Sequence, residues 1–263
     1  MEVLRFKNLG SGSAGNATLV QAQSGNTTTQ ILIDCGLSMP ELSARLALID
    51  LGLTDLDALF ITHEHTDHVG HARQFGLRTG KPIWCSQGTQ LASQTQDWGL
   101  RPEQMCCARD GEVIEVGGLE ITPFTVPHDA REPLQVCMSD GNVKLGLVTD
   151  LGHASAHVLQ SLQGCHALIL EANHDQDMLR LSKYPSFLKS RISGPLGHLS
   201  NQASAQLLQN VMHDQLKTVV AAHLSEKNNT PELVAQAFGS VLNCAAHDVI
   251  IAHQEHGTDW WMV

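Results

Sequence analysis

A run of six residues, His63-Glu64-His65-Thr66-Asp67-His68, constrains the fold of this chain more than any other feature. It follows residues 58–61, an apolar stretch with the length of a short buried strand. Three imidazoles and two carboxylates therefore lie just beyond the end of a predicted strand. The run predicts a loop of polar side chains that is held in place by a buried element.

The side chains of this loop are typical metal ligands. Neutral imidazole and carboxylate bind Zn²⁺ and similar divalent ions. Alternate residues of an extended loop point the same way, so His63 and His65 could share one ion while Asp67 and His68 turn toward a second. The simpler interpretation is a solvated polar loop or a chance cluster of histidines. The density of ligand types directly after a buried strand favours the metal site.

The pattern of short elements predicts an α/β fold. Strands and turns alternate in the first third, and Gly117-Gly118 and Asp140-Gly141 are flanked by apolar runs that predict two hairpins. Apolar periodicity predicts strands over 167–170 and 218–222, and helices over 41–51, 69–77, 200–212 and 231–241. Such a layout suits two β-sheets packed face to face with helices outside. Since repeats and linkers are lacking, we expect residues 1–263 to form a single domain.

Composition limits the cellular compartment and the binding partners that we expect for this chain. Seven cysteines without a CxxC pair predict a reduced, cytoplasmic chain. A secretory signal and a membrane span are not expected, because charges interrupt the N-terminus and no apolar stretch approaches about 18 residues. A net charge of -11 disfavours non-specific binding of nucleic acid.

The six-residue run resembles the HxHxDH signature of the metallo-β-lactamase superfamily. Four further residues match that family's pattern in order and at predicted strand ends: Asp34, His128, Asp150 and His223. The resemblance covers nearly the whole chain. It implies a four-layer αββα sandwich that binds two divalent metal ions.

The resemblance also implies the ligands of each ion. The first ion would take His63, His65, His128 and Asp150, and the second would take Asp67, His68, Asp150 and His223. Asp34 would orient a ligand loop instead of binding metal, and Glu64 is not expected to be a ligand because both of its neighbours are. Zn²⁺ is the expected metal, and Mn²⁺ or Fe²⁺ are alternatives because such donor sets accept each of them.

Four further segments narrow the branch of the superfamily: residues 9–17, 170–175, 197–201 and 223–229. Together they resemble the YycJ/WalJ-type subgroup, whose activity is exonucleolytic cleavage of DNA. The related phosphodiesterase tRNase Z has a glutamate after a strand and a histidine before a helix that assist the leaving group. The resemblance implies this role for Glu171 and His198, and a second role for Asp67 in holding the attacking hydroxide. DNA is therefore expected as substrate before RNA.

Several polar segments allow two interpretations. The Gly/Ser loop over residues 10–16 could cradle an anion or simply form a tight turn. Ser200 and Asn201 are expected to cap a helix, although a helix N-terminus also favours phosphate. Asn228 and Asn229 could contact substrate or begin a helix. Three cations surround two aromatic residues over 183–191, where we expect a solvated helical face before a contact for nucleic acid: Lys183, Lys189 and Arg191, with Tyr184 and Phe187.

Other functions compete with phosphodiester hydrolysis. A lactone or thioester hydrolase of the glyoxalase II type would use the same metals, but Glu171 and His198 argue against it because a zinc-bound alkoxide needs less help to leave. A non-catalytic metal-binding or sensor module is disfavoured by intact ligands at every proposed position. A redox di-iron enzyme usually carries an electron-carrier domain, and the sequence shows none.

Overall fold

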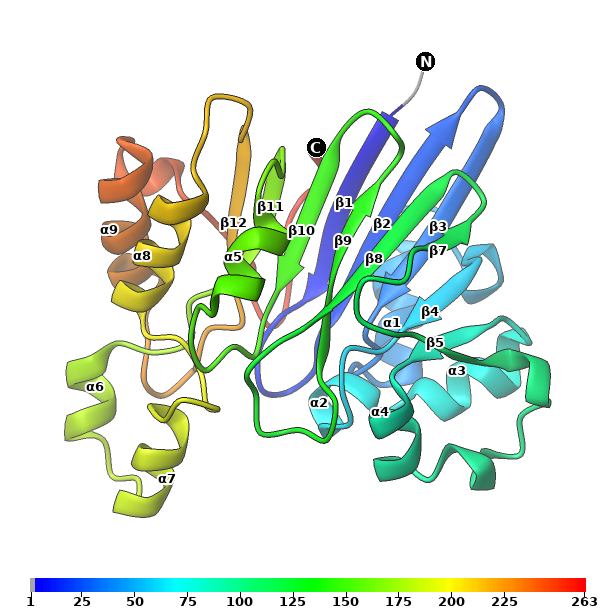
Figure 1. Ribbon diagram of the computed structural model, residues 1–263, viewed down its shortest axis with the longest axis horizontal. Coiled ribbons are helices and arrows are strands. Elements are labelled where there is room, and N and C mark those ends of the chain that lie inside the picture. Colours follow the sequence, from blue (N-terminus) through cyan, green and yellow to red (C-terminus); the bar gives the residue numbers. More distant parts are fainter. Residues whose placement is uncertain (1–2) are drawn as a thin grey trace.

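Two seven-stranded sheets pack face to face in the computed structural model, which describes residues 3–263 (Figure 1). Side chains from both sheets form the central core, as Phe6 and Ile31 of one sheet and Leu147 and Ile169 of the other show. Helices cover both outer faces. The predicted α/β fold, a four-layer αββα sandwich, is confirmed.

The first sheet is antiparallel at one side and parallel at the other. Its strand order is β14-β1-β2-β3-β4-β5-β6, and β3 to β6 run parallel to one another. Its strands are β1 (Val3–Gly10), β2 (Ala17–Ser24), β3 (Thr27–Ile33), β4 (Ala58–Phe60), β5 (Ile83–Cys85), β6 (Met105–Cys107) and β14 (Trp261–Met262).

The second sheet is likewise antiparallel at one side and parallel at the other, and its strand order is β13-β12-β11-β10-β9-β8-β7. Two antiparallel hairpins confirm the turns predicted at Gly117-Gly118 and Asp140-Gly141, and β10 to β13 run parallel. Its strands are β7 (Ile114–Val116), β8 (Leu119–Thr125), β9 (Leu134–Ser139), β10 (Lys144–Val148), β11 (Ala167–Glu171), β12 (Thr218–Ala222) and β13 (Ile250–Ile251).

Amphipathic helices cover the sheets. Leu42 of α1 and Phe75 of α3 pack on the first sheet, and Leu207 of α8 and Phe238 of α9 pack on the second. The helices are α1 (Met39–Ala47), α2 (Thr66–Val69), α3 (Ala72–Thr79), α4 (Gln87–Ala92), α5 (Ala156–Leu162), α6 (Gln176–Leu181), α7 (Ser186–Ile192), α8 (Asn201–Val211) and α9 (Pro231–Leu242), with 3₁₀ turns η1 (Leu53–Asp55), η2 (Thr95–Trp98), η3 (Pro102–Gln104) and η4 (Ala246–Asp248).

The structure corrects two predicted boundaries. The helix predicted over 41–51 ends at Ala47, and the helix predicted over 69–77 is divided into α2 and α3. The second half of the histidine run is a helical turn instead of an extended loop, because the carbonyl of His65 accepts hydrogen bonds from the amides of His68 and Val69. The ring of His68 remains close to that of His63, with 4.1 Å between their centroids.

Two further observations concern the cysteines and the helices. All seven cysteines have free thiols, as expected. Within residues 3–263, no helix combines the length and the apolar character needed to cross a membrane.

Candidate metal centre

The candidate ligands gather at the carboxyl ends of parallel strands. Asp34 follows β3 and His63 comes shortly after β4 in the first sheet. Asp150 comes shortly after β10, Glu171 ends β11, and His223 follows β12 in the second. Carboxyl ends of parallel strands meet at one edge of a sheet, where ligands bind in such folds. Both sheets therefore supply side chains to one cluster.

Three of these residues have an unusual backbone conformation. Asp34 (φ 63°), Asp150 (φ 55°) and His223 (φ 56°) are in the left-handed region. A non-glycine residue there costs on the order of 1–3 kcal/mol, and such strain concentrates at functional sites. The chain maintains this strain at three strand ends that meet at the same cluster.

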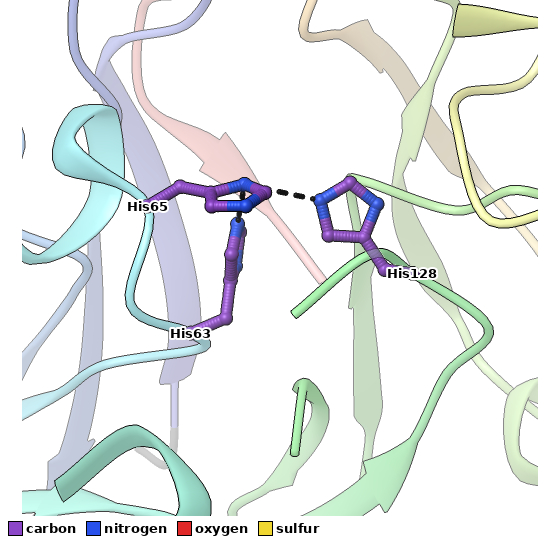
Figure 2. Close-up of side chains that lie close together, drawn as sticks. All are labelled: His63, His65 and His128. Atoms are coloured by element: carbon purple, nitrogen blue, oxygen red, sulfur yellow. Dashed lines mark hydrogen bonds between the residues drawn. The ribbon is translucent and has the colours of Figure 1, made fainter. Parts of the chain in front are cut away.

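One group of imidazoles has the spacing of a zinc site. The Nδ1 atom of His65 lies 3.1 Å from Nε2 of His63 and 3.3 Å from Nε2 of His128 (Figure 2). Nitrogen ligands at 2.0–2.1 Å from a tetrahedral zinc lie about 3.3 Å from one another. Nδ1 of His128 lies 3.1 Å from the carbonyl oxygen of Gly197 and donates to it. The lone pair of its Nε2 is then directed at the other two rings.

Burial keeps two of these rings neutral. It lowers the pKa of His63 well below its usual value, and the nearby His68 lowers it further. Burial also lowers the pKa of His128. Since only neutral imidazole binds a metal, these residues are held in the form that a ligand requires.

A second group lies next to the first and includes an unpaired nitrogen. Oδ2 of Asp67 lies 3.5 Å from Nε2 of His68 and 3.5 Å from Nε2 of His223. Among the described residues, Nε2 of His223 has no hydrogen-bond partner although it is buried. An unpaired buried nitrogen costs free energy, so these three donor atoms fit a cation between them.

Asp150 reaches both groups. Its Oδ2 lies 3.0 Å from Nε2 of His68 without the geometry of a hydrogen bond, and its Oδ1 lies 3.8 Å from Nε2 of His128. Burial would raise the pKa of Asp150, but His223 and His68 lower it well below its usual range. A buried carboxylate between the two groups has the position predicted for a ligand shared by two ions.

Asp34 orients His68, as predicted. Its Oδ2 lies 2.7 Å from Nδ1 of His68, and its Oδ1 accepts from the amide of Thr62 at 2.8 Å. A carboxylate bound to one ring nitrogen fixes the tautomer and turns the other nitrogen toward a metal. Thr62, which the sequence did not single out, also places its hydroxyl 3.0 Å from Nδ1 of His63.

The Gly/Ser loop supports the ligands instead of offering free donors. Its amides at Gly12 and Ala14 donate to Asn16 and Gln254, which favours the tight turn over the anion cradle. Ser11 accepts a hydrogen bond from the amide of His223 at 2.8 Å.

The same region fixes Asp67. The Asn16 side chain donates to the Asp67 carbonyl at 3.2 Å and contacts its Oδ2 at 3.3 Å. A Cβ atom at Gly36 would lie only 1.8 Å from that carbonyl oxygen. These supporting residues were not predicted, because nothing in their local sequence shows which distant segment they contact.

Glu171 connects His198 to the ligand cluster. Its Oε1 accepts from Nδ1 of His198 at 2.7 Å and from Nδ1 of His223 at 3.2 Å. Its Oε2 accepts from the amides of Leu151 and Leu199 at 2.9 and 3.0 Å. The sequence predicted that Glu171 and His198 act as a pair, and the structure places them in direct contact.

The pair is electrostatically coupled. Burial would raise the pKa of Glu171, but His198 lowers it to about 2. Burial would likewise lower the pKa of His198, yet Glu171 raises it above its usual value. The fully buried carboxylate therefore stays an anion and favours the protonated form of the half-buried histidine.

A cavity of about 240 Å³ opens over the cluster. Candidate ligands line one side and residues near α7 line the other. Asp129 lies at its rim, with Oδ1 3.5 Å from Nε2 of His128 and Oδ2 2.5 Å from Nε of Arg191. The lining of this cavity includes His65, Asp67, Asp129, Asp150, Tyr184, Leu188, Arg191, Ile192, His198 and His223.

The remaining singled-out residues have structural partners. Glu64 accepts a hydrogen bond from the amide of Arg131 at 2.7 Å. The buried side chain of Asn229 bonds to Asn201 and to the carbonyl of Ala172. Ser200 caps α8. The simpler interpretation holds for the cap, and Asn229 joins the segment after β11 to the start of α8.

The chain is also similar to known proteins. A family model described as a beta-lactamase superfamily domain matches residues 29–223. The chain is 32% identical over 256 residues to exodeoxyribonuclease YycJ of Bacillus anthracis, covering 97% of this chain and 96% of that protein. It is 30% identical over 231 residues to exodeoxyribonuclease WalJ of Streptococcus pneumoniae, covering 87% and 84%.

Solved structures show the same fold. The metallo-beta-lactamase fold protein YhfI from Bacillus subtilis superposes with a TM-score of 0.74, over 99% of this chain and 100% of that one. The sequence identity is 15%, so this likeness concerns the arrangement of the sheets and helices alone.

Proposed function

Because this chain belongs to the metallo-β-lactamase superfamily and is a metal-dependent hydrolase, we propose that it is a two-metal phosphodiesterase that removes nucleotides from the ends of DNA. The contact between Glu171 and His198 beside the clustered ligands carries the proposal, because it provides an acid for an oxygen leaving group. Two relatives named as exodeoxyribonucleases support it.

Seven side chains would hold the ions, and zinc fits them well. One group offers three imidazoles, and the other offers two imidazoles and a carboxylate, with Asp150 between them. When bound, two divalent ions would activate a water molecule and offset the negative charge that builds on the phosphate. The proposed ligands are His63, His65, Asp67, His68, His128, Asp150 and His223. Since they come from both sheets, the activity requires the chain as one domain.

His198 would protonate the leaving oxygen. It lines the cavity, and its Nδ1 is bound by Glu171, so its Nε2 is the atom that can donate a proton to substrate. The raised pKa of His198 favours the protonated ring that a general acid requires. Positioned acids of this kind accelerate reactions by about 10²- to 10⁴-fold.

Asp67 would orient the attacking water. It lines the cavity, and although burial would raise the pKa of Asp67, the nearby imidazoles of His223 and His68 lower it well below the usual range. A carboxylate held as an anion accepts a hydrogen bond or a proton from water. Asp67 and His198 both line the cavity, so attack and departure can be assisted at one phosphate.

A substrate panel tests the proposal. The purified protein, loaded with Zn²⁺ or Mn²⁺, should release nucleotides from linear DNA and leave closed circular single strands intact. His65→Ala should abolish the activity, and His247→Ala, at a side chain that is 85% exposed, should not. A metal-loaded protein that is inert on DNA, RNA and bis(p-nitrophenyl) phosphate but hydrolyses a lactone or a thioester would overturn the proposal.

A further inference from the structure

We propose that residues 178–197, here called the basic arm, hold a single DNA strand beside the metal centre. One base would stack on Phe187, and phosphates would contact Lys183, Lys189 and Arg191. The inference rests on the proposed function and identifies the surface that binds its substrate.

The charge of the arm is opposite to that of the chain. Four cations lie between residues 178 and 213, and this stretch contains no aspartate or glutamate. The whole chain has a net charge of -11. Because a nucleic-acid backbone is bound chiefly by neutralising its phosphates, the charge of this stretch suits it. The four cations are Arg180, Lys183, Lys189 and Arg191.

The arm also exposes an aromatic ring. Phe187 is 75% exposed, and all seven residues of α7 are at least partly exposed. Single exposed apolar residues are common on protein surfaces, but Phe187 lies in sequence between two of the cations. Aromatic rings among cations are the usual platform for single-stranded nucleic acid. A helix without a buried side chain adds little to the core, so we expect α7 to serve by contacting a ligand.

The arm forms one wall of the cavity over the ligands. Tyr184, Leu188 and Arg191 line this cavity together with Asp67 and His198. In Figure 1, α6 and α7 lie apart from α8 and α9, which cover the second sheet. A strand whose phosphate lies at the metal centre would therefore pass directly over the arm.

Hydrogen bonds hold the arm in this position. Arg191 is paired with Asp129 at the cavity rim, with 2.5 Å between Nε and Oδ2. The ammonium group of Lys189 donates to the carbonyl of Arg180 at 2.7 Å, which ties α7 to α6. Lys227 lies 5.9 Å from the ring of Tyr184 and adds a cation on a neighbouring loop.

A second cavity continues the cationic surface beyond the proposed acid. It has a volume of about 500 Å³, and Arg180, Lys189 and His198 line it. His198 thus lines both cavities. A strand that leaves the metal centre past His198 meets the cations of the arm next, which fits a leaving group that is itself part of a strand.

A single strand fits better than a duplex, because stacking on Phe187 requires an unpaired base. Stacking accepts any base, so we expect little sequence preference.

Two variants and two matched controls test the arm. We compare kcat/KM on a single strand of about 12 nucleotides, within the length that such surfaces engage, with kcat/KM on bis(p-nitrophenyl) phosphate, which reaches only the metal centre. Phe187→Ala should lower the ratio of the two by about tenfold, the scale of one stacked base. Leu48→Ala, at another exposed apolar residue (84%), should leave the ratio unchanged.

The double variant Lys183→Gln, Lys189→Gln should make the affinity for the single strand less dependent on salt concentration. Each phosphate contact to a single strand contributes about 0.7 to the slope of log affinity against log salt, so the slope should fall by about 1.4. Lys217→Gln, at an exposed lysine just before β12, is the control and should keep the wild-type slope.

Unchanged ratios and slopes in the arm variants would overturn the inference, and so would equal losses on both substrates, which would mean that the arm only shapes the metal centre. If the wild-type protein cleaves no phosphodiester, the proposed function fails, and anisotropy of a labelled strand with metal-loaded His198→Ala protein tests the arm by itself. Binding that weakens with Phe187→Ala supports the arm, whereas binding of RNA alone contradicts it.

Discussion

Replacing Glu171 with glutamine should separate general-acid catalysis from metal binding. The carboxylate accepts four hydrogen bonds, two from backbone amides at Oε2 and two from the Nδ1 atoms of His198 and His223 at Oε1. Glutamine has one oxygen. If that oxygen keeps the two amides, its NH₂ group faces the two imidazoles, and their Nδ1 atoms must accept instead of donate.

The structure indicates how much Glu171→Gln should cost in rate and in metal affinity. A pKa of about 2 in place of the usual 4.5 means that the site stabilises the Glu171 anion by about 3 kcal/mol more than water does. Without this anion, His198 loses the charge that raises its pKa. A lost general acid costs about 10²- to 10⁴-fold in rate, and a lost carboxylate partner of a ligand histidine costs about 10- to 100-fold in metal affinity.

The assay uses two leaving groups at saturating metal. The alkoxide of DNA needs a proton, whereas p-nitrophenolate does not, so Glu171→Gln should lower kcat on DNA much more than kcat on bis(p-nitrophenyl) phosphate. The alkaline limb of the DNA profile should also move to lower pH. Glu64→Gln is the matched control, because that side chain binds the amide of Arg131.

Wild-type turnover of DNA by Glu171→Gln would refute the role of the pair. Equal losses on both substrates at normal metal content would refute it as well, because they would place Glu171 in metal positioning alone.

Three further predictions concern the ligand cluster. Asp34→Asn should weaken metal affinity by about 10- to 100-fold in a competition with a chelating dye, because it loosens the histidine that Asp34 orients. Gly36→Ala should displace the carbonyl of Asp67 and destabilise the protein by about 1–3 kcal/mol in urea unfolding, whereas Gly52→Ala, with 3.6 Å to its nearest neighbour, should not. In metal-free protein, carboxylates raise the pKa of His223 from 6.5 to about 10 in spite of burial. The stabilisation of the fold by the charged His223 ring is then complete below pH 6.5 and lost as pH rises through about 10. The midpoint of urea unfolding should therefore fall over that range in metal-free protein, whereas the midpoint of a zinc-loaded sample should not.

The candidate ligands could be singled out from the sequence because their spacing is local or tied to strand ends. His63, His65, Asp67 and His68 lie within six residues, and the apolar strand before them shows where they are held. Asp150 and His223 were singled out by the resemblance to the metallo-β-lactamase pattern, and each comes at or just after the end of an apolar run. Periodicity identified these runs, because buried parallel strands are almost continuously apolar.

The supporting residues could not be predicted for the opposite reason. Ser11 contacts the backbone of a residue 212 positions away, and Asn16 contacts a residue 51 positions away. Asp129 follows His128 directly, yet only the folded chain brings Arg191 to it from 62 positions away. Local sequence shows the chemistry of a side chain and not its distant partner.

The helical turn of α2 illustrates the same limit at short range. A loop and a single helical turn have the same polar composition over residues 66–69. What decides between them is tertiary contact, because the amide of Cys35 donates to the carbonyl of His68 and the amide of Asn16 donates to that of Asp67. These contacts hold the turn that directs Asp67 and His68 toward the second group of ligands.

One carboxylate oxygen links the two halves of the proposed mechanism. Oε1 of Glu171 accepts from Nδ1 of His223, a proposed metal ligand, and from Nδ1 of His198, the proposed acid. A metal bound by His223 would make the proton on Nδ1 of that ring more acidic, which would strengthen its hydrogen bond to Oε1 and draw charge away from His198. The pKa of His198 should therefore be lower in the metal-loaded protein than in the metal-free protein. On this reasoning, metal binding would make His198 a stronger proton donor to a leaving group.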